Sequence, residues 1–101
     1  MNKNSKIYLA GHRGLVGSAI LKKLEEKGYL NIVVRTHAEL DLTRQVEVER
    51  FFQEEKPEIV ILAAAKVGGI GANARYPADF IYQNLAIALN VIEAARKYNV
   101  E

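Results

Sequence analysis

The chain contains three short apolar runs separated by longer amphipathic segments. The runs lie at residues 7–10, 32–34 and 59–63, and the last is the most apolar segment of the chain. Runs this short, composed mainly of aliphatic and β-branched residues, are typical of strands buried on both faces. The pattern therefore predicts three strands.

Apolar residues recur at helical spacing in the remaining segments, which predicts helices over 15–27, 44–56 and 77–98. Thr43 is the expected cap of the second helix, and Gly28 the expected stop of the first. The side chains expected to face the core are Leu15, Val16, Ala19, Ile20 and Leu24 in the first helix, Val48, Phe51 and Phe52 in the second, and Ile81, Leu85, Ala88, Leu89, Ile92 and Ala95 in the third.

The alternation of strands and helices predicts the α/β class, as a three-layer Rossmann-type parallel sheet with helices on both faces. The expected strand order is 3-2-1, with a fourth strand beside the first. Residues 1–101 would form only the first βαβαβα half of such a domain, which leaves the first strand as an open edge. We therefore expect either a piece of a longer, truncated protein or a neighbouring chain that covers this edge.

A glycine-rich turn, GHRGLVG at residues 11–17, joins the first strand to the first helix. A pyrophosphate needs unobstructed backbone N–H groups and the positive end of a helix dipole. Gly11 would permit the turn, Gly14 would let the diphosphate approach, and Gly17 would let the helix pack closely on the strand. The spacing is GxxGxxG rather than GxGxxG, so a purely structural turn is the alternative to a dinucleotide site.

The other residues of this turn, His12, Arg13, Leu15 and Val16, complete the predicted cofactor loop. NAD enzymes usually place a carboxylate after the second strand to bind the ribose 2′-hydroxyl, but this chain has Arg35 there. A guanidinium group can bind a 2′-phosphate through two parallel hydrogen bonds, and Arg13 could reach the same phosphate. The sequence thus favours NADP, with a solvated surface arginine as the alternative for Arg35.

Two further positions extend the predicted cofactor site. Asp41 could accept from the adenine amine while Leu42 covers the ring; alternatively, Asp41 caps a turn or the second helix. Ala63, Ala64 and Ala65 end the third strand, where small residues would let the cofactor cross the carboxyl edge of the sheet. Tight packing is the alternative explanation for these alanines.

The composition excludes several other function classes. There is no cysteine, and a metal site is improbable because His12 and His37 lack clustered ligands. Fourteen basic residues are interleaved with 12 acidic ones, so neither a nucleic-acid surface nor a membrane patch is indicated. The start of the chain resembles neither a signal peptide nor a membrane span, which makes the cytoplasm the expected location.

Three segments carry a family resemblance: 9–19, 63–70 (AAAKVGGI) and 76–84 (YPADFIYQN). They resemble the GDP-L-fucose synthases, a family of extended short-chain dehydrogenases/reductases. The resemblance implies an NADPH-dependent epimerase and reductase acting on GDP-4-keto-6-deoxy-mannose, with Arg13 and Arg35 at the 2′-phosphate. It also implies a homodimer that pairs through the third helix, whose apolar face would otherwise belong to the core.

The resemblance places the catalytic Ser and Tyr-x-x-x-Lys pair, and the GDP-sugar pocket, beyond Glu101. None of the five tyrosines has a lysine four residues later, so we expect no catalytic residue in this chain and no activity from it alone. Lys66 is expected at the surface and Asn84 as a structural tether. The alternatives are a non-catalytic NADP-sensing module and another nucleotide-sugar epimerase or dehydratase.

Overall fold

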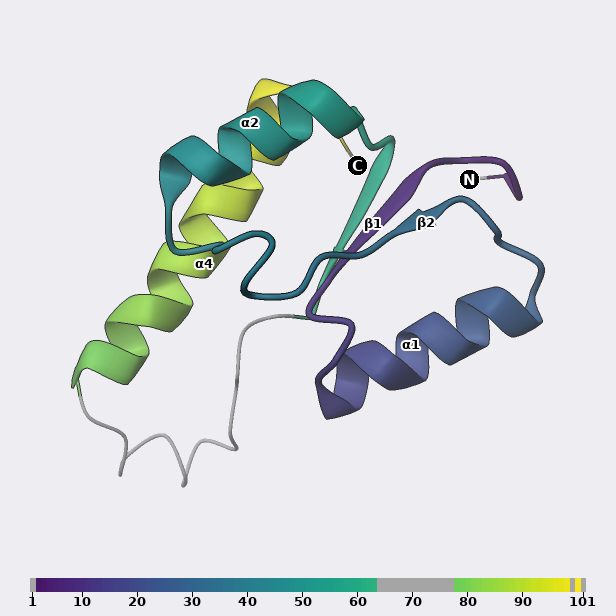
Figure 1. The fold of residues 1–101 in the computed structure, drawn as a ribbon, viewed down its shortest axis with the longest axis horizontal. Helices are drawn as coiled ribbons and strands as arrows, with labels where there is room; N and C mark the ends of the chain where they lie inside the picture. The colour runs from purple at the N-terminus through teal and green to yellow at the C-terminus, as the bar shows by residue number, and fades with distance from the viewer. Residues whose placement is uncertain (1, 64–77, 99, 101) are drawn as a thin grey trace.

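A computed structural model of the chain describes residues 2–63, 78–98 and 100, with the backbone alone for 78–84 (Figure 1). Its elements are β1 (Ile7–Ala10), α1 (Leu15–Glu26), β2 (Ile32–Val33), α2 (Gln45–Glu55), β3 (Ile59–Leu62) and α4 (Ala78–Lys97). The predicted alternation of strands and helices is confirmed. Gly28 follows the end of α1 with a φ of 88°, a left-handed conformation suited to a helix stop.

The three strands form one parallel sheet in the order β2-β1-β3. Ile7 pairs with Ile32 on one side of β1, and the whole of β1 pairs with Ile59–Leu62 on the other. The parallel α/β fold is therefore confirmed, but the expected order 3-2-1 and the open edge at the first strand are wrong.

Burial explains why β1 takes the central position. Its four residues are at most 1% exposed, and a partner on each side satisfies the backbone groups that an edge would leave unpaired. Residues 34–44 form turns that carry the chain across the face of the sheet from β2 to α2. The strand that follows α2 can therefore pair with the other side of β1.

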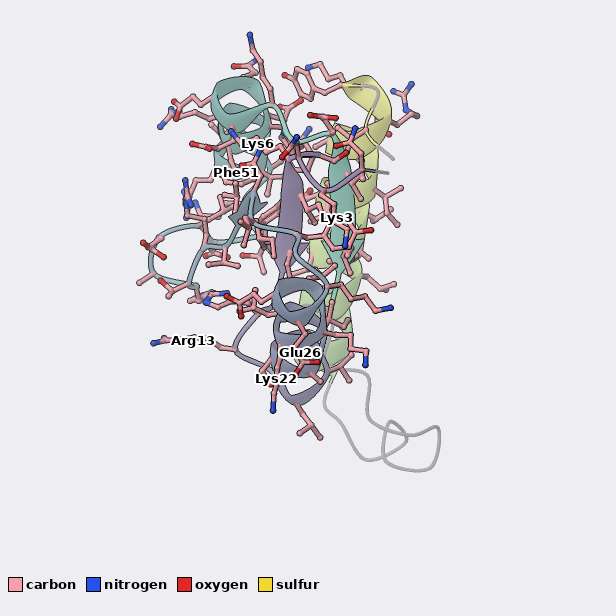
Figure 2. The ribbon with its side chains drawn as sticks, turned by 90° about the vertical axis from the view of Figure 1, so that its right-hand side faces the viewer. Lys3, Lys6, Arg13, Lys22, Glu26 and Phe51 are labelled. Carbon is pink, nitrogen blue, oxygen red and sulfur yellow. The ribbon has the colours of Figure 1, made fainter. Side chains whose placement is uncertain are left out.

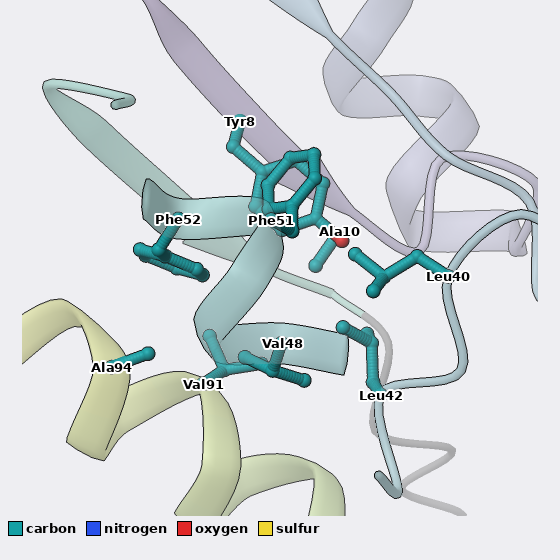
Figure 3. Close-up of a cluster of buried hydrophobic side chains, with 9 residues drawn as sticks. All are labelled: Tyr8, Ala10, Leu40, Leu42, Val48, Phe51, Phe52, Val91 and Ala94. Atoms are coloured by element: carbon teal, nitrogen blue, oxygen red, sulfur yellow. The ribbon is translucent and has the colours of Figure 1, made fainter. Parts of the chain in front are cut away.

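Helices cover both faces of the sheet, as predicted (Figure 1). Tyr8 and Ala10 point toward α2 and α4 and enter the main core cluster (Figure 3). Because side chains alternate along a strand, Ile7 and Leu9 point the opposite way, toward α1. The cluster comprises Tyr8, Ala10, Leu40, Leu42, Val48, Phe51, Phe52, Val91 and Ala94.

The expected core face is confirmed for α2 but not for the other two helices. In α1, Leu24 is buried, whereas Leu15 and Val16 are exposed because they lie at the open end of the helix. Thr43 is not the cap of α2, which begins at Gln45 after Arg44 and has no side-chain cap.

The core face of α4 differs from the predicted one. Val91 and Ala94 are buried, while Leu85, Leu89 and Ile92 are 58%, 66% and 61% exposed. The helix carries two apolar faces, and the described part of the chain covers only the one that packs on α2 and β3. The side chain of Ile81 lies outside the described residues.

We predict that Val48→Ala lowers the free energy of unfolding by about 2 kcal/mol, because it removes two buried methyl groups and leaves a cavity. Val46→Ala is the matched control, since Val46 lies on the same helix and is 68% exposed. Urea unfolding compares the two variants. Equal stability changes would contradict the assignment of Val48 to the core.

Candidate functional site

The glycine-rich turn presents the amino end of α1 without a cap. Gly11 has a φ of 89°, and its carbonyl accepts a hydrogen bond from the N–H of Gly14 at 3.2 Å. Gly14 precedes the helix in an extended conformation and makes no side-chain cap, and the first turn of α1 holds no acidic residue. The N–H groups of this turn and the helix dipole together form a cradle for an anion.

Gly17 brings α1 close to the turn. A Cβ placed at Gly17 would overlap the carbonyl oxygen of Gly11 and lie 2.6 Å from its carbonyl carbon. The predicted close packing at Gly17 is therefore confirmed.

Gly14 is not crowded in this way. A Cβ there would meet only the carbonyl oxygen of Gly11, at 3.6 Å, an ordinary contact. No described atom of the protein therefore crowds position 14, and the turn fits an anionic group.

The side chains of the turn surround this cradle without filling it. Leu15 and Val16 are 90% and 63% exposed, and Arg13 projects away from the body of the molecule (Figure 2). Nδ1 of His12 is buried and has no hydrogen-bond partner among the described residues. Arg13 makes no ion pair in the described part of the chain, so its guanidinium is available to an anion.

A reciprocal pair of hydrogen bonds shapes the segment after β2. The N–H of Thr36 donates to Oε1 of Glu39 at 2.7 Å, and the N–H of Glu39 donates to Oγ1 of Thr36 at 3.3 Å. The bond from the N–H of Thr36 to the carboxylate is the main reason that the pKa of Glu39 is lowered; the hydroxyl of Thr36 adds to it, and the charges of Arg35 and His12 contribute less. This pair was not predicted from the sequence, although Thr-x-x-Glu is the signature of a capping box.

Asp41 stabilises a local turn, one of its two predicted alternatives. Its Oδ1 accepts from the hydroxyl of Thr43 at 2.6 Å and from the N–H of Thr43 at 3.0 Å. The hydroxyl contact is the main reason that the pKa of Asp41 is lowered, with burial opposing it.

Leu42 lies in the core rather than at the surface, with 8% of its area exposed, so its side chain is not placed to cover a ring. Its carbonyl accepts a hydrogen bond from Nδ2 of Asn90 in α4 at 3.0 Å. Asn90 therefore tethers this segment to α4, a role that the sequence analysis gave to Asn84, whose side chain lies outside the described residues.

Arg35 is held by other residues of the protein and is only partly exposed to solvent. Its guanidinium donates to the carbonyl of Val34 at 2.8 Å and to Oε2 of Glu55 at 3.2 Å. It also lies over the ring of Phe51, 5.3 Å from the centroid. The arginine predicted to bind a 2′-phosphate is thus present at the end of β2 but engaged elsewhere.

Ala63 continues the pairing of β3 with β1, since its N–H donates to the carbonyl of Ala10 at 2.8 Å. The cradle, the 34–44 segment and Ala63 all follow carboxyl ends of strands, where open α/β sheets bind ligands. Ala64, Ala65 and Lys66 lie outside the described residues.

Two further properties of the described residues concern metal binding and membrane insertion. No group of three or more potential metal ligands is found among them. None of the helices described is both long and apolar enough to span a membrane.

We predict that Gly17→Ala destabilises the fold by about 1–3 kcal/mol, because its methyl group overlaps the backbone of Gly11. Gly14→Ala is the matched control and should change the free energy of unfolding by less than about 0.5 kcal/mol, since its methyl group makes only an ordinary contact with the carbonyl oxygen of Gly11. Thermal unfolding measures both. A tolerated alanine at position 17 would contradict the observed approach of α1.

Comparison with known proteins identifies the family. Residues 7–101 match the NAD dependent epimerase/dehydratase family. The chain is 64% identical to GDP-L-fucose synthase 1 of Arabidopsis thaliana over 99% of this chain and 31% of that protein. It is 53% identical to GDP-L-fucose synthase of Escherichia coli K12, over 94% of this chain and 30% of that protein.

A solved structure described as a GDP-mannoheptose C4 reductase from Campylobacter jejuni with NADP bound is 48% identical, with a TM-score of 0.89. The match covers 99% of this chain and 32% of that one. The chain thus spans about a third of the length of the curated relatives it matches. With the family profile matched over nearly all of its residues, the chain belongs to the NAD-dependent epimerase/dehydratase family.

Proposed function

We propose that residues 1–101 form the NADP(H)-binding Rossmann half of an NADPH-dependent GDP-4-keto-6-deoxy-mannose epimerase/reductase, which makes GDP-L-fucose. The observation that carries the proposal is the uncapped amino end of α1, which is packed against Gly11 at Gly17 and open at Gly14. The high identity to proteins named GDP-L-fucose synthases supports the substrate, and a similar structure described with NADP bound supports the cofactor.

The proposed binding mode assigns different roles to the backbone and to the side chains. Backbone N–H groups of residues 15–17 would bind the diphosphate, and Arg13 and Arg35 the 2′-phosphate. Asp41 would reach the adenine with its second carboxylate oxygen, since Oδ1 is engaged by Thr43. Ala63 to Ala65 would line the path across the sheet, and bound NADPH supplies the hydride for ketone reduction.

The chain itself would position the cofactor and leave proton transfer to residues outside 1–101. A ketone reduction requires a proton donor, and the family resemblance places the Ser and Tyr-x-x-x-Lys group in the larger protein. The GDP-sugar pocket is proposed to lie there as well. Residues 1–101 alone would bind nucleotide weakly and catalyse nothing.

One observation favours a second candidate, an NAD-using epimerase or dehydratase of the same family. Glu39 lies close enough to His12 and Arg35 for their charges to act on its carboxylate. A carboxylate after the second strand is the group that usually binds a ribose 2′-hydroxyl. Against this role, Glu39 already accepts a hydrogen bond from Thr36.

Calorimetric titration of the full-length protein with NADP and NAD tests the proposal. We expect tighter binding of NADP, and a loss of about 10- to 100-fold in NADP affinity for Arg13→Ala with little change for NAD, because one charged hydrogen-bond donor is removed. Arg50→Ala, at an exposed position on α2, is the control. Equal affinity for the two nucleotides, or no NADPH oxidation with GDP-4-keto-6-deoxy-mannose, would contradict the proposal.

We also propose that the enzyme is a homodimer that pairs through α4. Leu85, Leu89 and Ile92 recur at spacings of four and three residues, which places them on one face of the helix, and all three are more than half exposed. Unpartnered apolar surface of this kind is typical of an interface. The family resemblance led to the same expectation for this helix.

Leu89→Lys should shift the dimer toward monomer, because it places a charge in the centre of the proposed interface. Leu30→Lys is the matched control, since Leu30 is 84% exposed and lies outside α4. Sedimentation equilibrium of the full-length protein measures the mass. A monomeric parent protein, or equal masses for both variants, would contradict the proposal.

A further inference from the structure

The guanidinium of Arg35 is held by three groups at once. It donates to the Val34 carbonyl at 2.8 Å and to Oε2 of Glu55 at 3.2 Å, and its cation lies over the ring of Phe51. The other oxygen of the same carboxylate binds Nζ of Lys6 at 3.0 Å. Glu55 thus bridges two cations, and Arg35 is one of them.

Lys6 and Glu55 lie toward the amino end of β1, away from the anion cradle, whereas the backbone of Arg35 follows the carboxyl end of β2. Lys6 immediately precedes β1, and Gly11 immediately follows it. Four residues of strand separate the two ends by about 13 Å. Figure 2 shows Lys6 and Phe51 toward one end of the molecule and Arg13 toward the other. The Arg35 side chain is therefore turned away from the cradle in which the diphosphate would lie.

We propose that Glu55 is a positioning residue that competes with the 2′-phosphate of NADP for the guanidinium of Arg35, and so lowers the affinity for NADP without affecting NAD. The inference rests on the proposed function, because it takes Arg35 to be a ligand of the 2′-phosphate. The Nη2 N–H that binds Glu55 cannot serve the phosphate in the same conformation, so the phosphate and Glu55 compete for this donor.

The expected effect of Glu55 on NADP affinity depends on how exposed the Arg35–Glu55 ion pair is. The side chains of Arg35 and Glu55 are 31% and 29% exposed, so water weakens their attraction. Glu55 also keeps Lys6 as a partner when Arg35 leaves, and no unpaired carboxylate remains. Partly exposed pairs of this kind correspond to a change in affinity of about two- to five-fold.

The carboxylate of Glu55 is ionised at neutral pH. The hydrogen bond from Lys6 is the main reason that the pKa of Glu55 is lowered, with further contributions from the charges of Lys6 and Arg35 opposing burial. The competition is therefore present at neutral pH and does not depend on small pH changes there.

Glu55→Gln in the full-length protein is the direct test, because it removes the charge and keeps the size of the side chain. Calorimetry with NADP and NAD should give an NADP affinity about two- to five-fold higher and an unchanged NAD affinity. Glu54→Gln is the matched control: it makes the same change in net charge beside Glu55, at an exposed residue of the groove that Arg35 also lines. It should leave both affinities unchanged.

Two further variants separate the possible outcomes. Arg35→Ala should weaken NADP binding, and Glu55→Gln added to it should have no further effect. Lys6→Met should weaken NADP binding by about two-fold, because Glu55 then loses a competing cation and holds Arg35 more firmly. Circular dichroism shows whether Glu55→Gln folds. If it does not, the effect of Lys6→Met on NADP binding tests the inference instead.

Weaker NADP binding by Glu55→Gln would overturn the inference, since Glu55 would then orient Arg35 productively. An equal effect of Glu54→Gln, or a gain from Glu55→Gln that persists without Arg35, would overturn it as well. If Arg35→Ala leaves NADP binding unchanged, Arg35 does not bind the 2′-phosphate, and both the proposed function of Arg35 and this inference are wrong. If Arg35→Ala weakens binding while Glu55→Gln does not strengthen it, the inference alone fails.

Discussion

The site depends on the close approach of α1 to the turn that follows β1. No side chain fits at position 17, because a Cβ would overlap the carbonyl of Gly11. Gly11 can present that carbonyl only because it takes a left-handed conformation. Together these two glycines fix the amino end of α1 at the carboxyl edge of the sheet, and Gly14 leaves it open.

The rest of the fold holds this arrangement in place. β1 is central and paired on both sides, so the turn starts from a rigid strand. The segment between β2 and α2 is stabilised by the Thr36–Glu39 pair, the Asp41–Thr43 turn and the hydrogen bond from Asn90. Arg13 is available to an anion, whereas the guanidinium of Arg35 is bound to Glu55, whose carboxylate also binds Lys6. Of the two arginines expected to select NADP, Arg35 is thus paired with a carboxylate, whereas Arg13 has no ion pair among the described residues.

Periodicity and turn chemistry were sufficient to predict the elements, the parallel sheet and the roles of Gly11 and Gly17. They could not predict the strand order, because the order depends on how residues 34–44 cross the sheet, and their turns follow from side-chain hydrogen bonds such as Thr36 with Glu39. The core face of α4 was also missed, because the helix has two apolar faces and periodicity cannot say which one contacts α2. The position of Arg35 depends on Glu55, 20 residues later in the chain, which no local pattern reveals.

The most direct test of this account is the change in backbone amide chemical shifts when NADP is added to the isotope-labelled protein. If the amino end of α1 binds the diphosphate, the largest changes should fall on the N–H groups of Leu15, Val16 and Gly17, and 3′-AMP, which has no diphosphate, should not reproduce them. If those signals stay fixed while NADP shifts others, such as Gln45 and Glu49 in the groove between α2 and α4, the cradle is not the binding site.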